Sequence, residues 1–84
     1  MHIIIAYDVE AKHTEKFKKI CQIYLTRVQN SVFEGDIEKA DLMRLTDSLR
    51  REAKENETIR VWITSRILDT IRIGISKDLE NGII

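Results

Sequence analysis

The chain has 84 residues, of which 43% are hydrophobic and 33% are charged, and this balance excludes an intrinsically disordered protein. Its 14 basic and 14 acidic residues cancel, which argues against a protein that binds polyanions over its whole surface. The single cysteine excludes an internal disulfide, and no apolar run reaches the ~18 residues that a membrane helix needs. We therefore expect one small cytoplasmic domain over residues 1–84, without a signal peptide and without a membrane partner.

The first predicted element is a strand over residues 2–9, HIIIAYDV. Ile4 and Ala6 lie on the same side as Asp8, whereas Tyr7 and the other isoleucines alternate onto the opposite side. A strand that is apolar on both sides is typical of the centre of a sheet whose two faces are both covered. The carboxylate of Asp8 is unusual in this company, so it needs water, a counter-charge or a metal ion.

Helical spacing of apolar residues, Cys21 among them, predicts a helix over residues 15–25 that Thr14 caps. Cys21 is expected to be a small buried hydrophobe on that helix. The β-rich composition of residues 27–34 is interrupted at Asn30-Ser31. This segment is either one bent strand or two short strands around a tight turn.

A second apolar stripe predicts a helix that begins with Asp36 as its cap and runs to about residue 54. Alternating apolar residues then predict strands over residues 58–65 and 69–75. A last apolar pair, residues 83–84, follows Gly82.

This order of elements predicts an α+β fold, the ferredoxin-like βαββαβ sandwich with an extra C-terminal strand. Right-handed crossovers place both helices on one face of the sheet and leave the other face bare. Because the first strand is apolar on both sides, we expect the bare face to pack against a second copy in a symmetric homodimer.

Two-fold symmetry in such a dimer can bring Asp8 of one chain toward Asp8 of the other. Facing carboxylates repel unless a cation lies between them, and magnesium takes one or two carboxylates while it keeps several waters. A water on such an ion can attack a phosphodiester. The alternative is that Asp8 simply ends the strand and caps the following turn.

Three segments, IIIAYDV, YLTRVQNSVFEGDI (residues 24–37) and IRIG…NGII, resemble the small CRISPR-associated protein two family. Members are spacer-adaptation subunits, also described as metal-dependent endonucleases, and the likeness spans essentially the whole chain. The resemblance implies a ferredoxin-like homodimer in which both Asp8 carboxylates hold a shared Mg²⁺ ion. It also implies that the C-terminal strand and tail, about residues 69–84, pair with the other protomer.

The resemblance also implies which residues form the site. The family's catalytic positions correspond here to Asp8, Tyr7, Arg27, Ser31 and Phe33. Many relatives have arginines early in the first helix where this chain has lysines, and lysine binds phosphate only as a point charge. The implied nucleic-acid-binding residues are Arg27, Lys12, Lys16, Lys18 and Lys19. Weaker candidates for a basic track are Arg50, Arg51, Arg60, Arg66 and Arg72.

Two functions follow from the resemblance. One is a magnesium-dependent endonuclease that cuts single-stranded RNA or double-stranded DNA during CRISPR spacer acquisition. The other is a non-catalytic dimer that bridges CRISPR-associated integrase subunits and binds DNA. A regulatory dimer that binds a small ligand is a further alternative, although no loop offers ligand-binding chemistry, and a toxin-type ribonuclease of related fold is another. His2 and His13 have no evident partner, and no Cys/His cluster indicates zinc.

Overall fold

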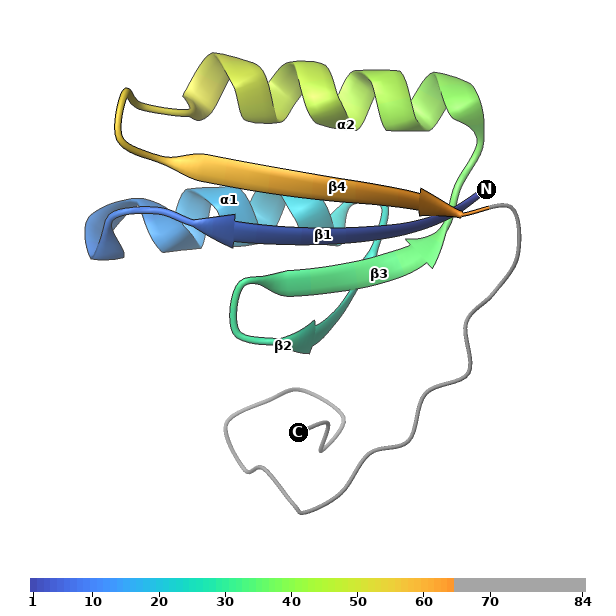
Figure 1. The fold of residues 1–84 in the computed structure, drawn as a ribbon, viewed down its shortest axis with the longest axis horizontal. Coiled ribbons are helices and arrows are strands. Elements are labelled where there is room, and N and C mark those ends of the chain that lie inside the picture. The colour runs from blue at the N-terminus through green and yellow to red at the C-terminus, as the bar shows by residue number, and fades with distance from the viewer. Residues whose placement is uncertain (65–84) are drawn as a thin grey trace.

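The computed structural model describes residues 1–64, which form a four-stranded antiparallel sheet covered on one face by two helices (Figure 1). The strands lie in the order β2-β3-β1-β4, so β1 is central and pairs with both β3 and β4. This is the expected ferredoxin-like α+β arrangement. In chain order the elements are β1 (His2–Asp8), the 3-10 turn η1 (Ala11–His13), α1 (Thr14–Gln22), β2 (Thr26–Gln29), β3 (Val32–Asp36), α2 (Lys39–Glu52) and β4 (Thr58–Thr64).

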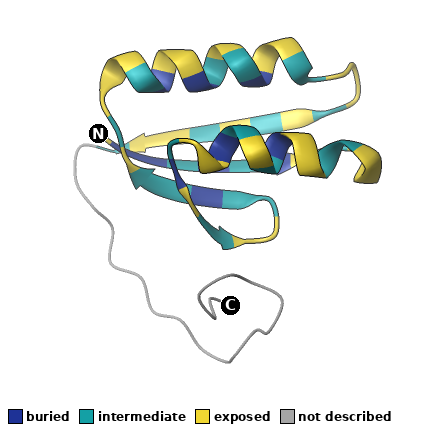
Figure 2. Cartoon of the chain, turned by 180° about the vertical axis from the view of Figure 1, so that it is seen from behind, coloured by how far each residue is buried: buried dark blue, intermediate teal, exposed yellow. Residues whose placement is uncertain are grey.

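The hydrophobic core lies between the sheet and the two helices, as the buried residues in Figure 2 show. From the sheet it takes Ile3, Ile5 and Tyr7 of β1, which alternate with the residues on the other face. The helices contribute the predicted stripes: Phe17 and Cys21 from α1, and Leu42, Leu45 and Leu49 from α2. Cys21 is fully buried, as predicted.

The first helix begins differently from the prediction. Residues 11–13 already wind a 3-10 turn that runs directly into α1, so Thr14 is not the residue that caps it. The Thr14 hydroxyl instead donates a hydrogen bond of 2.8 Å back to the carbonyl oxygen of Ala11. The helix ends at Gln22, and Leu25 packs into the core after the helical turn.

The cap predicted for the second helix is also wrong. Asp36 is the last residue of β3 and pairs with His2 in the sheet register. Helix α2 starts at Lys39 after an extended Glu38, and its first backbone bond runs from Leu42 to the Glu38 carbonyl oxygen. The helix is displaced because pairing with β1 holds Asp36 in the sheet.

The segment over residues 27–34, which the sequence left open as one bent strand or two short strands, contributes to two short strands. Strands β2 and β3 make a hairpin around Asn30-Ser31, with an irregular register between Arg27 and Gln29. Ser31 adopts a φ of 62°, the left-handed conformation that tight hairpin turns require. The guanidinium of Arg27 donates a hydrogen bond to the side-chain oxygen of Asn30 across this turn.

The sheet face opposite the helices carries the second set of β1 side chains. Ile4 and Ala6 are half-buried there and Asp8 is exposed. Trp62 of β4 pairs with Ile4 in the register, and it is 46% exposed. An apolar, partly exposed face of this kind is what the homodimer prediction needs, and the dimer itself stays a prediction.

The predicted strand at 69–75 and the tail at 83–84 lie outside the described residues. Neither helix of residues 1–64 has the length and apolar character required to cross a membrane.

Candidate functional site

Asp8 lies at the carboxyl end of β1, on the sheet face that the helices leave open. Its neighbour in the antiparallel register is Thr58, the first residue of β4. The side chain is exposed, so water solvates the carboxylate. The apolar side chains of the strand could not do so. Asp8 is therefore available as an oxygen ligand at the surface of the protomer.

Within residues 1–64, no group of three or more His, Cys, Asp or Glu side chains is arranged to hold a metal ion. A single exposed carboxylate is the donor set that Mg²⁺ accepts, since this ion keeps most of its water shell. It does not provide the closed nitrogen or sulfur cage that structural zinc requires. Asp8 thus fits Mg²⁺ as one ligand of a site that needs further donors.

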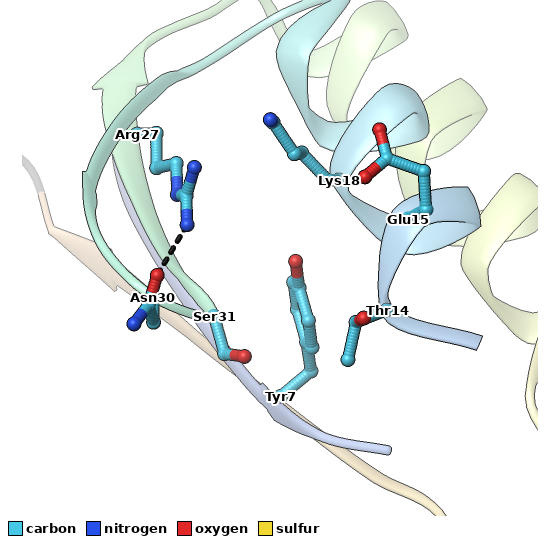
Figure 3. Close-up of a pocket in the computed structure, with 7 residues that line it drawn as sticks. All are labelled: Tyr7, Thr14, Glu15, Lys18, Arg27, Asn30 and Ser31. Carbon is cyan, nitrogen blue, oxygen red and sulfur yellow. Dashed lines mark hydrogen bonds between the residues drawn. The ribbon is translucent and has the colours of Figure 1, made fainter. Parts of the chain in front are cut away.

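Three of the other predicted site residues gather on the opposite side of the sheet. A cavity of about 200 Å³ lies between the start of α1 and the β2–β3 hairpin. Figure 3 shows Tyr7, Arg27 and Ser31 around it. Its remaining lining residues are Thr14, Glu15, Lys18 and Asn30. Because Tyr7 and Asp8 are successive strand residues, their side chains leave the sheet in opposite directions. The structure therefore divides the predicted site in two.

Tyr7 is a buried aromatic residue whose hydroxyl reaches the cavity (Figure 3). Burial, with a smaller contribution from Cys21, raises the pKa of Tyr7 to about 12, and the guanidinium of Arg27 opposes this shift. The phenol consequently keeps its proton at neutral pH. Tyr7 can donate a hydrogen bond there, but it cannot act as a general base.

Phe33 lies wholly inside the core. Its ring stacks on Tyr7 with centroids 6.1 Å apart, and the Phe17 ring centroid lies 5.3 Å from that of Tyr7. Phe33 reaches no solvent and does not line the cavity, but it packs on Tyr7 and pairs with Arg27 in the sheet register.

The family model for CRISPR associated protein Cas2 matches residues 1–70 of this chain. The chain belongs to the Cas2 family.

Curated Cas2 relatives are similar over nearly the full length. CRISPR-associated endoribonuclease Cas2 of Pyrococcus furiosus is 39% identical, and the match covers 100% of both chains. CRISPR-associated endoribonuclease Cas2 2 of Archaeoglobus fulgidus is 37% identical over 94% of this chain and 89% of its own.

Solved structures agree with the fold. A crystal structure of Cas2 superposes with a TM-score of 0.84 at 34% identity, covering 100% of this chain and 98% of that one. Streptococcus pyogenes Cas2 at pH 6.5 gives a TM-score of 0.71 at 29% identity, covering 77% of this chain and 87% of its own.

The four predicted nucleic-acid-binding lysines of this Cas2-family chain differ in their surroundings. Lys12 lies 3.7 Å from Glu10, and Lys16 lies 3.9 Å from Glu52, with side chains 85% and 57% exposed. Lys19 is also exposed, whereas Lys18 lines the cavity beside Tyr7. Exposed ion pairs of this kind contribute little to stability and are screened by salt, so Lys12 and Lys16 can exchange partners readily.

Both histidines have carboxylate partners that the sequence did not reveal. His2 Nε2 lies 3.1 Å from Glu34, across the β1–β3 pair. His13 Nδ1 lies 2.8 Å from Glu57, which also accepts hydrogen bonds from the backbone N–H groups of Glu10 and Lys54. These partners are 32 and 44 residues apart in the chain, so no local spacing signals them.

Proposed function

We propose that this chain is a CRISPR-associated metal-dependent endonuclease whose active form is a two-fold homodimer. In this dimer, Asp8 of each protomer binds a shared Mg²⁺ ion at the open face of the sheet. The substrate is single-stranded RNA or double-stranded DNA, cut at a phosphodiester bond.

The observation that carries this proposal is the placement of Asp8. It is an exposed carboxylate at the end of the central strand, on the same face as Ile4, Ala6 and Trp62. A second copy packed on that partly apolar face would cover exposed hydrophobic surface. The two-fold axis would then supply the second carboxylate that one protomer lacks.

Bound at this position, Mg²⁺ would supply an activated water and offset negative charge on the phosphodiester. Asp8 holds the ion through oxygen atoms that already face solvent. The adjacent pairing of Asp8 with Thr58 holds the strand end in the sheet. Because residues 1–64 bring no group of three metal-ligating side chains together, we expect weak metal affinity and slow turnover.

The relatives support the nuclease part of the proposal. The Pyrococcus furiosus and Archaeoglobus fulgidus proteins are both called endoribonucleases, and this chain matches nearly the whole of each. Single-stranded RNA is accordingly the first substrate to test. The competing function is a non-catalytic dimer that bridges integrase subunits during spacer integration, and it needs nucleic-acid binding without a metal site.

The test compares wild type, Asp8→Asn and Asp36→Asn for cleavage of single-stranded RNA and of double-stranded DNA, each with Mg²⁺ and with chelator. Asp36 is a matched control, because it is an exposed aspartate at the opposite end of the β1–β3 pair. Size-exclusion chromatography of all three proteins shows whether the dimer is retained.

We expect Mg²⁺-dependent cleavage by wild type and by Asp36→Asn, and a loss of about 100-fold or more in a dimeric Asp8→Asn protein. Cleavage that survives Asp8→Asn or ignores the chelator overturns the proposed site. Absent cleavage, together with binding of double-stranded DNA that is unchanged in Asp8→Asn, supports the bridging function instead.

A further inference from the structure

The cavity between α1 and the β2–β3 hairpin is lined mainly by hydrogen-bond donors. The Tyr7 and Ser31 side chains bring hydroxyl groups, and Arg27 brings a guanidinium. The Thr14 hydroxyl already donates its proton to the Ala11 carbonyl oxygen. In Figure 3 the polar ends of Tyr7, Arg27 and Lys18 point toward the same space. Donors that converge in this way select a ligand made of acceptor atoms.

The charge of the lining favours an anion. Arg27 and Lys18 are positive, and Glu15 is the single acidic side chain that lines the cavity. Lys18 takes part in another interaction of the chain. Arg27 is therefore the cation that we expect to bind the ligand. Its guanidinium is already oriented by the hydrogen bond to Asn30, which reduces the entropy lost when a ligand binds.

The size of the cavity limits the ligand. It measures about 200 Å³, whereas sites for drug-sized molecules measure roughly 300–1,000 Å³. A phosphate group fits these dimensions. The tetrahedral oxygens of phosphate also match a planar guanidinium flanked by hydroxyls.

Ser31 keeps a side chain at a turn position where glycine is the usual residue. Its φ of 62° lies in a region that costs energy for a residue with a side chain, and glycine would relieve that cost. Serine at this position keeps a hydroxyl on the cavity wall. The Ser31 carbonyl oxygen also accepts a 3.0 Å hydrogen bond from the Tyr7 backbone, so the two hydroxyl-bearing residues are held together.

We propose that this cavity binds a phosphate group through the Arg27 guanidinium and the hydroxyls of Tyr7 and Ser31. The site is separate from the Asp8 position, because Tyr7 and Asp8 point to opposite faces of β1. It requires neither Mg²⁺ nor nuclease activity. A phosphate group bound there lies on the other side of the sheet from the Asp8 carboxylate.

Two sources can supply this phosphate group: the free ion, or the terminal phosphate of a nucleic acid strand. The test titrates metal-free protein with inorganic phosphate, and follows the backbone amide signals of Asn30 and Ser31 by NMR. A second arm uses a short RNA with a 5′-phosphate and the same RNA without it.

The variants are Arg27→Gln, Ser31→Gly and Arg44→Gln. Glycine tolerates the backbone conformation at residue 31, so Ser31→Gly removes the hydroxyl without straining the turn. Arg44 is an exposed arginine on α2 that is paired with Asp41, and it serves as the control for general charge loss.

We expect saturable shifts in wild type and in Arg44→Gln. Affinity should be about 10-fold weaker in Arg27→Gln, and severalfold weaker in Ser31→Gly. If only the phosphorylated RNA reproduces the shifts, the source is a strand terminus; if only the free ion does, the cavity is a phosphate-ion site. Shifts that do not saturate overturn the proposal. Arg27→Gln and Ser31→Gly proteins that retain the folded spectrum and bind phosphate as tightly as wild type overturn it too.

Discussion

His13 Nδ1 lies 2.8 Å from the Glu57 carboxylate, and this contact joins the segment that follows Asp8 to the loop that leads into β4. Glu57 also accepts the backbone N–H of Glu10 at 3.1 Å and that of Lys54 at 2.8 Å. One carboxylate, whose side chain is 2% exposed, thus holds three N–H donors from two loops. The contact closes the end of the sheet where Asp8 pairs with Thr58.

Replacing Glu57 with Gln should lower the melting temperature by several degrees. The amide keeps one acceptor oxygen but puts a donor where the backbone N–H groups and His13 need an acceptor, and a buried donor left unsatisfied is costly. Thermal unfolding measured by circular dichroism tests this. Glu55→Gln, at an exposed position in the same loop, is the control and should melt within about a degree of wild type.

The stability of the fold should fall in acid partly through Glu57. Burial acts to raise the pKa of this carboxyl, but hydrogen bonds from the Lys54 backbone, His13 and the Glu10 backbone outweigh it and hold the pKa below its ordinary value. A carboxyl whose pKa is lower in the folded state stabilises the protein above its unfolded pKa, about 4.3 for Glu. That contribution is lost as the pH falls through the folded pKa.

The measurement is urea unfolding of wild type and Glu57→Gln between about pH 3 and pH 6. Wild type should lose its advantage over the variant at the acid end of this range. A difference that stays constant with pH would contradict the linkage between Glu57 and folding.

The core position Leu45 can be compared with a neighbour on the same helix. Leu45 is fully buried, so Leu45→Ala should destabilise the protein by about 2–5 kcal/mol. Met43 is 58% exposed on α2, and Met43→Ala should change the stability by less than about 0.5 kcal/mol. Chemical denaturation gives both values. A large loss in Met43→Ala would mean that a partner surface covers this residue.

Trp62 provides a direct probe of the proposed dimer. It is the chain's only tryptophan, it pairs with Ile4 on the open sheet face, and it is 46% exposed in one protomer. Packing of a second copy on that face would remove the indole from water, so dilution should shift its emission to longer wavelength. Emission that does not change over a dilution series, while sizing chromatography reports dissociation, would place the dimer interface elsewhere.

Cys21 should react with thiol reagents only when the protein unfolds. Its side chain is fully buried, and burial raises the pKa of the thiol to about 12. The reactive thiolate is therefore scarce and shielded at neutral pH. Titration with a chromogenic disulfide in native buffer and in denaturant measures both rates. Fast labelling of the native protein would indicate local opening of α1.

The elements whose patterns are local could be predicted from the amino-acid order alone. Apolar alternation over residues 2–9 identified the central strand, and the stripes through Cys21 and Leu45 identified the helices, because side chains on one face of an element must share the same environment. Asp8 was found in the same way, as the one polar residue at the end of that strand. The matched positions of Tyr7, Arg27 and Ser31 came from resemblance rather than pattern.

The remaining features depend on contacts between distant segments of the chain. Sheet pairing holds Asp36 opposite His2 and so displaces the start of α2, which a local capping rule cannot foresee. The partners of His13 come together only when the two loops meet. The separation of Asp8 from Tyr7 also depends on which sheet face the helices cover. In each case the deciding contact joins residues distant in the chain, and its energy depends on burial that appears only once the sheet and helices have packed.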